Sequence, residues 1–552
     1  MSSCPTTSST PLLAQNLEDA VVDHVHDRRR RLQNLPGSLK ADSTLVTHTH
    51  ECCHDEMSAS IAPDVSDILS RHSIALVGEE PTTSFKNELT GLISSSIPVA
   101  IASLCQYLLT VALVFSVGRL GSAELAAISL SSMTANISGY AIIQGVATSL
   151  DTLCPQAYGR KELNWVGVHF FRCTILLLFV SCPIMLFWIF GLYRSLVYFV
   201  HDQELASFAS LYLRVIAFGV PAFILFENAK HFLQAQGLFN PLAYILGICA
   251  PINAILNYVL VWDRHIGLGF IGAPLSVVIT NYLMCFMIYI YIFVLDGRKC
   301  WPHQAIFHPI YWLNWKRMIN LAIPGVLMVE LEWLAFEVIT LEASRFGTTV
   351  LAAQSIINTT CVLLYQIPFA LSIATSTRIA WYVGAASERA SQTCATVAVL
   401  LSLVSGSIFG ALLYMFRYQF ASLYTDDTAI IALAGRTLII ASVYQVFDFL
   451  SCATGGIMRG QGRQQICGFV SLGSYYTLGL PCAYIFGFVL KWELTGLWVG
   501  MIIALMTILM TQLYFVRVSN WKVIINEAAY DECLDLSSIV NRSESYQSIN
   551  DT

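Results

Sequence analysis

Charged residues are scarce in this sequence. Asp, Glu, Lys and Arg together make up 12% of its 552 residues, whereas about a quarter is typical of a soluble domain. Apolar residues make up 56%, and the mean hydropathy is +0.62. This composition excludes an ordinary soluble protein and predicts a chain that crosses a membrane several times.

Signals of several other protein classes are also missing. The net charge is −6, and no basic groove or zinc-finger spacing occurs, so no nucleic-acid partner is expected. The 16 cysteines are scattered, mostly within apolar segments such as those around Cys105 and Cys249, which argues against a disulfide framework. No apolar segment carries paired aspartates for magnesium–diphosphate binding or a His-centred catalytic motif. We therefore expect no enzymatic activity, no cofactor and no metal.

The first 86 residues lack the apolar content that folding would require. They are rich in Ser, Thr, Asp, His and Pro, and they contain no apolar core of a signal peptide. We expect a disordered cytoplasmic tail over residues 1–86. One cluster in it, His48-Thr-His50-Glu-Cys52-Cys53-His54, could bind a metal, but its spacing matches no structural zinc site.

Twelve apolar segments follow, each long enough to cross a hydrocarbon core of about 30 Å. They lie at 92–117, 124–149, 166–191, 206–227, 239–262, 270–295, 318–343, 349–375, 392–416, 430–456, 466–490 and 495–516. The pattern predicts an all-α polytopic membrane protein with an N-lobe at 87–295, a cytoplasmic linker at 296–317, a C-lobe at 318–517 and a cytoplasmic tail at 518–552.

The second half of the chain repeats the first. Pro98 and Pro324 are 226 residues apart, as are Gly121 and Gly347 within two similar segments. Tyr158-Gly159 and Val383-Gly384 are related by an offset of 225. Six spans per repeat give both halves the same orientation. We therefore expect two six-helix lobes related by a pseudo-two-fold axis along the membrane normal, with a substrate cavity between them.

Basic residues in the loops predict the orientation. With both termini cytoplasmic, eleven basic residues fall in inner loops and six in outer loops, as the positive-inside rule requires. The inner ones are Arg160, Lys161, Lys230, Arg298, Lys299, Lys316, Arg317, Arg378, Arg389, Arg459 and Arg463, and the outer ones are Arg119, Arg194, Arg264, Arg345, Arg417 and Lys491. We expect both termini in the cytoplasm, with the protein in the plasma membrane or the vacuolar membrane.

Four glutamates occur in the seventh apolar segment, namely Glu330, Glu332, Glu337 and Glu342. A carboxylate there costs about 2.5 kcal/mol or more, and acids within a span usually face a wet interior and bind cations or protons. On a helix, Glu330 and Glu337 lie about 20° apart and Glu332 about 140° from Glu337, so four acids on a straight helix cannot share one cavity. Glu332 and Glu337 are the best candidates and Glu330 is a possible third, while Glu342 is either a partner of Arg345 in an interfacial ion pair or a functional group.

Three further polar residues are candidates. Asp448 in the tenth span is either a second acid of the site or a structural carboxylate. Asp151, at the inner end of the second span, is expected to be a helix-end or gating carboxylate. Asn136 is expected either to face the cavity or to make a helix–helix contact. Arg459 is expected to be an anchor at the inner surface.

Aromatic residues accompany these acids in the sequence. Trp333, Phe336, Tyr365 and Phe447 lie near them. An acid beside aromatic faces is a suitable cradle for an organic cation. Plain packing is the alternative for each ring.

Three segments resemble the eukaryotic branch of the multidrug and toxic compound extrusion (MATE) family. They are Glu332-Trp333-Leu-Ala-Phe-Glu337, the stretch from Asp448 to Gly462, and Leu150-Asp151-Thr152-Leu-x-x-Gln156-Ala-Tyr-Gly159. The resemblance covers residues 88–517 and implies twelve helices in two lobes that export organic cations or xenobiotics in exchange for protons. It implies that Glu332 and Glu337 are the paired acids of the seventh helix, that Asp448 is the acid of the tenth, and that Asn136 lines the amino-terminal lobe.

The sequence departs from the family pattern at two positions. Leu334 stands where the family often has a second tryptophan, and Glu330 is additional to the usual pair. We expect a monomeric, proton-coupled antiporter of small organic cations embedded in the lipid bilayer, with sodium as an alternative coupling ion. The alternative function is a flippase of lipid or another solute. Such proteins typically use a cationic cavity for phosphate head groups, and the acid-rich seventh span argues against that.

Overall fold

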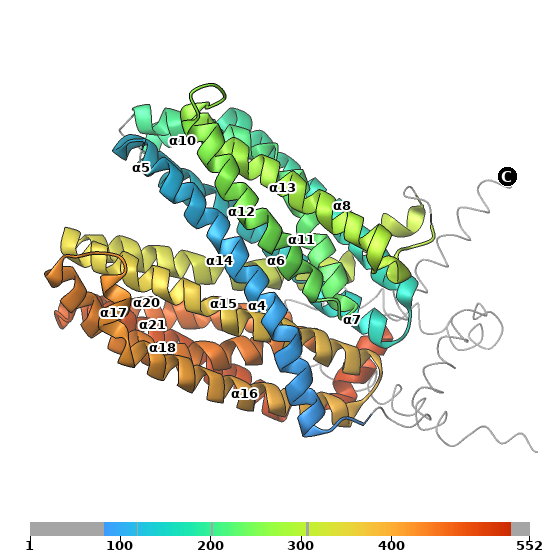
Figure 1. The fold of residues 1–552 in the computed structure, drawn as a ribbon. Coiled ribbons are helices and arrows are strands. Elements are labelled where there is room, and N and C mark those ends of the chain that lie inside the picture. The colour runs from blue at the N-terminus through green and yellow to red at the C-terminus, as the bar shows by residue number, and fades with distance from the viewer. Residues whose placement is uncertain (1–81, 119, 200–202, 305–307, 532–552) are drawn as a thin grey trace, which may run out of the picture. The chain divides into compact units, whose positions relative to one another are not determined.

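The computed structural model describes residues 82–531, apart from 119, 200–202 and 305–307. The predicted N-terminal tail and its His/Cys cluster lie outside the described residues, as does the end of the C-terminal tail. The regular elements of the described part are helices, and they form two groups that follow the two halves of the chain (Figure 1). The predicted all-α fold with two six-span lobes is confirmed.

The first lobe contains six spans. They are α4 (Phe85–Val117); α5 (Ser122–Ala135), η2 (Asn136–Tyr140), α6 (Ala141–Ala147) and α7 (Leu150–Gly159); α8 (Leu163–Leu186), η3 (Phe187–Gly191) and α9 (Leu192–Phe199); α10 (Gln203–Ala217) and α11 (Val220–Ala235); α12 (Asn240–Trp262); and η4 (Gly269–Ile271), α13 (Gly272–Ile290) and η5 (Tyr291–Leu295).

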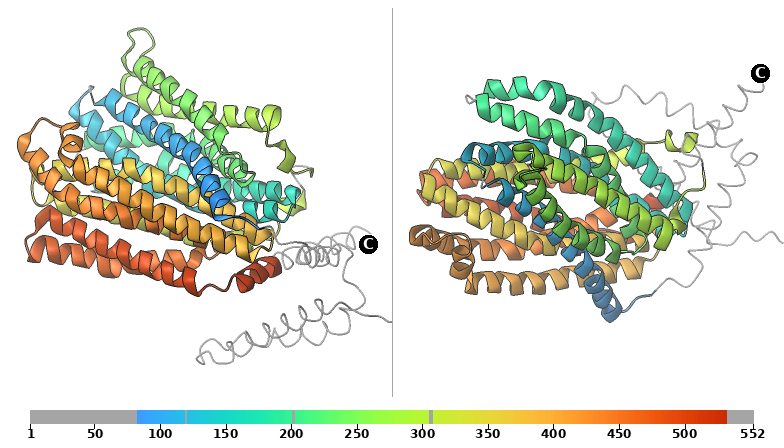
Figure 2. Two further views of the ribbon diagram at one scale, coloured as in Figure 1. Left: turned by 60° about the horizontal axis from the view of Figure 1, so that its bottom comes forward. Right: turned by 45° about the horizontal axis from the view of Figure 1, so that its top comes forward.

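The second lobe repeats this arrangement. Its elements are α14 (Lys316–Ser344); α15 (Thr348–Gly384); α16 (Glu388–Met415) with the short α17 (Arg417–Ser422); α18 (Thr428–Gly460); α19 (Gln464–Leu472), η8 (Gly473–Gly479), α20 (Leu480–Tyr484) and η9 (Ile485–Val489); and α21 (Glu493–Val518). Figure 2 shows the blue-to-green and the yellow-to-red helices as two groups from two further sides. Between the lobes, the chain forms short 3₁₀ turns at η6 (Arg298–Cys300) and η7 (Pro309–Tyr311).

The described helices account for the twelve predicted spans. Ten are long and apolar enough to cross a membrane, and the bent pair α10–α11 brings the number to eleven. The acid-rich α14, 29 residues long, is the twelfth. Several spans run further than their apolar segments, because α11, α15 and α18 end at Ala235, Gly384 and Gly460.

These longer helices correct the assignment of six basic residues. Lys230, Arg378 and Arg459 lie in the last turns of α11, α15 and α18, and Lys316, Arg317 and Arg389 lie in the first turns of α14 and α16, so none of them is in an inner loop. The fourth span is bent by 54° between α10 and α11, and α11 continues to Ala235, past the end of its apolar run at residue 227. The apolar pattern marks where lipid contacts a helix, but a helix can continue with polar residues where other helices cover it.

Helix α14 joins the two lobes. Its first turns, at Met318, Leu321 and Ala322, belong to the buried core of the N-lobe. Its last turns, at Ala335, Ile339 and Ala343, belong to the core of the C-lobe. The lobes therefore share one helix across their interface, and Glu330 and Glu332 lie between its two packed ends.

Small residues allow α14 to approach α6 closely. A Cβ on Gly325 would lie 2.2 Å from the Thr148 hydroxyl oxygen and 2.4 Å from the Gly145 carbonyl oxygen. A Cβ on Gly145 would lie 2.4 Å from Cα of Val326. Lipid provides no hydrophobic driving force between helices, so close backbone packing of this kind supplies the contact energy.

The segment between the lobes is anchored on the N-lobe. The Trp301 ring lies 4.7 Å from that of Phe293 and 5.2 Å from that of Phe171, centroid to centroid. Burial raises the pKa of the neighbouring Cys300 thiol to about 12, so this thiol stays protonated and unreactive at neutral pH. At the other end of the chain, residues 521–531 are helical and bury Trp521 and Ile524.

Candidate functional site

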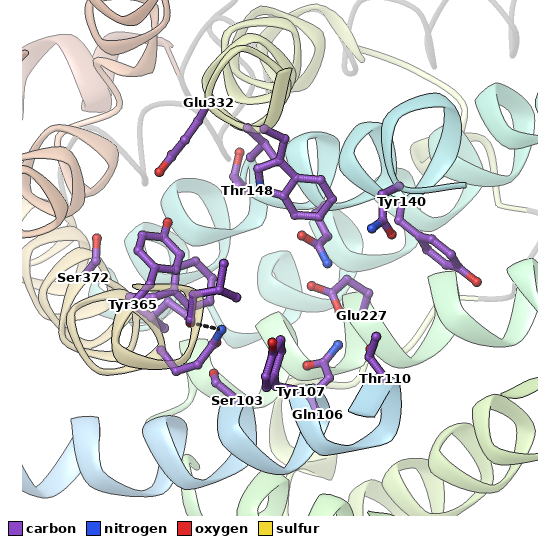
Figure 3. Close-up of a pocket in the computed structure, with 18 of the residues that line it drawn as sticks. Ser103, Gln106, Tyr107, Thr110, Tyr140, Thr148, Glu227, Glu332, Tyr365 and Ser372 are labelled. Carbon is purple, nitrogen blue, oxygen red and sulfur yellow. Dashed lines mark hydrogen bonds between the residues drawn. The ribbon is translucent and has the colours of Figure 1, made fainter. Parts of the chain in front are cut away.

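A cavity of about 610 Å³ lies between the lobes. Its wall includes residues of α4, η2, α11 and α13 from the first half of the chain and of α14, α15 and α18 from the second. Figure 3 shows Glu332, Tyr365 and Ser372 facing the same space as Glu227, Tyr107 and Tyr140. Both lobes contribute acids to this cavity, so we take it as the candidate site.

One stripe of α14 forms part of the wall. Its members recur at three- and four-residue intervals, which is the spacing of one broad helix face. They are Gly325, Met328, Val329, Glu332, Trp333, Phe336 and Glu337. The stripe is wide enough to include both Glu332 and Glu337, despite the angle of about 140° between them on a regular helix.

Glu332 and Asp448 come together on the C-lobe side. They are separated by more than a hundred residues, yet their carboxyl groups interact electrostatically. Asp448 is 2% exposed and accepts a hydrogen bond from Nε2 of Gln445 at 3.2 Å. Tyr365, Tyr444 and Tyr475 surround the pair and interact with both acids. Asp448 is buried and Glu332 is half-buried, and both line the same cavity as these three tyrosines.

Most of the predicted site residues line the cavity. They are Glu332, Glu337, Asp448, Asn136, Trp333, Tyr365 and Asp151. Asn136 begins the π-helical turn η2, a type of irregularity that frequently occurs at functional sites. The lining supports the cavity-facing alternative for Asn136 over a pure helix–helix contact.

The structure does not place Phe447 or Glu330 on the cavity wall. Phe447 packs against the buried core of the C-lobe, which is the packing alternative for that ring. Glu330 faces Tyr476, with which it interacts electrostatically. Its angle on α14 is close to that of Glu337, but the edge of the cavity falls between the two. Glu342 pairs with Arg345 at 3.4 Å, which is the ion-pair alternative for this residue.

A polar cluster on the N-lobe side was missed by sequence reasoning. Nδ1 of His231 lies 2.6 Å from Oδ1 of Asp151, and Nε2 of His231 lies 3.7 Å from Oε1 of Glu227. Lys230 also pairs with Glu227. All four line the cavity. The spacing of Glu227, Lys230 and His231 places them on one face of a helix, which is a signal that the sequence contains. It was not used because the predicted span ended at residue 227.

Arg459 lies between the two groups of acids and is not an anchor at the inner surface. It lines the cavity, is 8% exposed, and donates from Nη2 to the Ser372 hydroxyl at 2.7 Å. Its guanidinium interacts electrostatically with both Asp151 and Glu332. One cation of the C-lobe thus interacts with carboxylates of both lobes.

Polar contacts close the interface between the lobes at the end of the cavity where Arg459 and Asp151 lie. The Thr152 hydroxyl donates to the Arg459 carbonyl at 2.6 Å, and Nε2 of Gln464 donates to the Thr148 carbonyl at 3.1 Å. Nε1 of Trp381 donates to the Ala235 carbonyl at 2.8 Å. We call this set of contacts, together with the Glu88–Arg378 ion pair, the interlobe seal.

The repeat is visible within the seal. A Cβ on Gly159 would lie 2.2 Å from the Trp381 carbonyl oxygen, and a Cβ on Gly384 would lie 2.1 Å from the Gln156 carbonyl oxygen. These two glycines occupy equivalent positions in the repeat, and each packs on the backbone of the opposite lobe. The contacts are thus related by the pseudo-two-fold symmetry predicted from the sequence.

Comparison with known proteins agrees with this architecture. The MatE family model matches residues 98–259 and 324–485, two segments offset by the 226 residues seen in the repeat. The "Uncharacterized transporter YDR338C" of Saccharomyces cerevisiae is 40% identical over 444 residues, which cover 80% of this chain and 63% of that relative. This chain therefore matches less than two thirds of that relative's length.

Two further matches extend the comparison. Human "Multidrug and toxin extrusion protein 1" is 28% identical over 463 residues, or 83% of this chain and 79% of that protein. The crystal structure of the eukaryotic MATE transporter AtDTX14 superimposes with a TM-score of 0.74 at 25% identity, covering 81% of this chain and 99% of that one. The similarity spans both lobes.

Proposed function

The chain belongs to the MatE family of membrane transporters, and from that premise we propose that it is a proton-coupled antiporter that exports organic cations or xenobiotics. The observation that carries the proposal is that Glu332 of α14 and Asp448 of α18 line one cavity together with aromatic residues. Buried carboxyl groups are neutral when protonated and attract a cation when ionised. Protons and an organic cation therefore compete for the same two groups.

The size and lining of the cavity favour an organic cation. A volume of about 610 Å³ lies within the range of about 300–1,000 Å³ that holds drug-sized molecules. Trp333, Phe336 and Tyr365 provide ring faces beside the acids, and such faces attract a quaternary or protonated amine. The printed name of the human relative, a multidrug and toxin extrusion protein, agrees with this class of substrate.

Alternating access requires that the interlobe seal opens and re-forms. Proton binding and cation binding would each favour one arrangement of the lobes, because a ligand shifts an equilibrium only by its differential affinity for the two states. With both termini in the cytoplasm, as the basic loops indicate, the seal lies on the cytoplasmic side. The described state would then be the one that receives protons from the exterior or from the vacuolar lumen.

A lipid flippase is the second candidate that the sequence raised. The acids of the cavity speak against it, because Glu332, Glu337, Asp448 and Glu227 would repel a phosphate head group. Lys230 and Arg459 are the cations of the wall, and each is already engaged, Lys230 with Glu227 and Arg459 with Ser372.

Transport by purified protein in liposomes tests the proposal. With an acidic lumen, we expect proton-driven uptake of a labelled organic cation such as tetraethylammonium, and loss of that uptake in Glu332→Gln. The control variant Glu342→Gln removes an acid of the same helix that pairs with Arg345 outside the cavity, and it should transport normally. Undiminished uptake by Glu332→Gln would contradict the proposal, and transfer of labelled lipid without cation uptake would favour the flippase. Replacing the proton gradient by a sodium gradient shows which ion is coupled.

A further inference from the structure

The N-lobe wall of the cavity contains a second group of titratable residues, distinct from Glu332 and Asp448. His231 lies between two carboxylates, with Nδ1 2.6 Å from Asp151 and Nε2 3.7 Å from Glu227. Asp151, Glu227 and His231 are 5%, 2% and 6% exposed. The imidazole is held on both edges by acids from different helices, α7 and α11.

Unsatisfied polar atoms beside this group indicate that it receives a ligand. Oε2 of Glu227 is buried and has no hydrogen-bond partner, and neither amide atom of Gln234 has one. Gln234 is 2% exposed and lines the same cavity. Buried polar atoms without partners are destabilising, so three of them at one place in the wall point to a site that is completed by water, a proton or a cation.

The charges of the group fix what can be exchanged there. With His231 protonated, two carboxylates and two cations, Lys230 and His231, give a net charge of zero. When His231 loses its proton to water in the cavity, the net charge becomes −1. A transported monovalent cation bound in the cavity restores the balance. For this group alone, the loss of one proton is matched by one positive charge on the cation.

Three charged groups of the N-lobe interact with His231. Glu227 and Lys230 belong to its own helix, α11, and Asp151 belongs to α7. Arg459 of α18 interacts with Asp151 from the opposite lobe. From α8 comes the Cys173 thiol, which contacts Asn228 next to Glu227.

We propose that His231, held between Asp151 and Glu227, is a second proton-carrying site of the antiporter, on the N-lobe side of the cavity. This inference rests on the proposed function, since it adds one proton to the exchange at Glu332 and Asp448. Arg459, which interacts with Asp151 and with Glu332, couples the two sites electrostatically.

The number of protons exchanged per cation tests the inference. In liposomes clamped at zero membrane potential, a pH difference of one unit is balanced by a tetraethylammonium gradient that changes by about tenfold for each proton exchanged. We expect His231→Gln to transport tetraethylammonium with a balancing gradient about tenfold smaller than that of the wild type. The matched control is His169→Gln, because His169 is a buried histidine of the same lobe outside the cavity wall, and its balancing gradient should equal that of the wild type.

A second variant keeps the test decisive if His231→Gln does not fold. Without the Glu227 carboxylate, protonation of His231 would leave the group with a net charge of +1, so Glu227→Gln should also lose one exchanged proton. An unchanged balancing gradient in whichever variant folds overturns the inference. Absence of proton-driven flux in the wild type would instead contradict the proposed function itself, so the two failures are distinguishable.

Discussion

Arg378 of α15 and Glu88 of α4 form a two-point ion pair between the lobes. Nε of Arg378 lies 2.9 Å from Oε2 of Glu88, and Nη2 lies 2.8 Å from Oε1. The Tyr382 hydroxyl also donates to Oε1, and Glu88 is fully buried. A buried pair of this geometry is costly to break from one side, because the remaining charge is left without a partner.

Removing one partner of this pair should weaken the seal. Glu88→Ala leaves the Arg378 guanidinium without its carboxylate, and losing one partner of a buried pair costs about 3–5 kcal/mol. We expect a lower thermal unfolding midpoint and a shift toward the arrangement in which the seal is open. The control is Glu342→Ala, which breaks an exposed pair with Arg345 worth about 1 kcal/mol or less. Equal midpoints for the two variants would show that the Glu88 pair does not hold the lobes.

Adding a methyl group within the seal should separate the lobes directly. In Gly384→Ala, the new Cβ would lie 2.1 Å from the Gln156 carbonyl oxygen, and overpacking of this kind costs about 1–3 kcal/mol. We expect reduced transport and increased labelling by thiol reagents of a cysteine introduced at Gln464. Gly247→Ala in α12 is the control, because nothing lies within 4 Å of its Cβ. Wild-type transport and labelling by Gly384→Ala would contradict the close contact between α7 and α15.

Substitution of Asp448 should affect cation binding more than substitution of Glu330. Asp448→Asn removes a charge-assisted contact with the cation worth about 1.5–3 kcal/mol, equivalent to roughly ten- to a hundredfold in affinity. Glu330→Gln should retain binding, because Glu330 faces Tyr476 outside the cavity wall. Titration of purified protein with tetraethylammonium measures both affinities. A larger loss of tetraethylammonium affinity in Glu330→Gln than in Asp448→Asn would show that the cation binds on the Glu330 side of α14 and not in the cavity.

The two aromatic candidates should separate into a binding effect and a stability effect. Trp333→Ala should weaken cation binding by about 0.5–2 kcal/mol with little change in unfolding, because Trp333 lines the cavity. Phe447→Ala should lower the unfolding midpoint, at a cost of about 2 kcal/mol, below the range for a fully buried phenylalanine. Binding isotherms and thermal unfolding of both variants distinguish the two roles. If both substitutions changed cation binding and the unfolding midpoint to the same extent, the separate roles of Trp333 in binding and Phe447 in packing would be contradicted.

Sequence reasoning reached the fold because its signals are local or repeated along the chain. Long apolar runs predicted the spans, and the 226-residue offset predicted two lobes of equal orientation. The matched family segments at 98–259 and 324–485 carry the same offset. Glu332, Glu337 and Asp448 stood out because a carboxylate within an apolar span is costly, so each is visible without knowledge of its neighbours.

Only the tertiary structure decided which of these residues meet. Helical periodicity gives the angle of a side chain around its own helix, but not the helix it faces or where a cavity ends, and so Glu330 and Phe447 could not be separated from the site in advance. Helix α11 continues past the apolar run and contributes Glu227, Lys230 and His231 to the cavity wall, where His231 contacts Asp151 of α7. Their contacts depend on tilt, bending and close glycine packing between helices far apart in sequence, and these are properties of the packed bundle that no single segment contains.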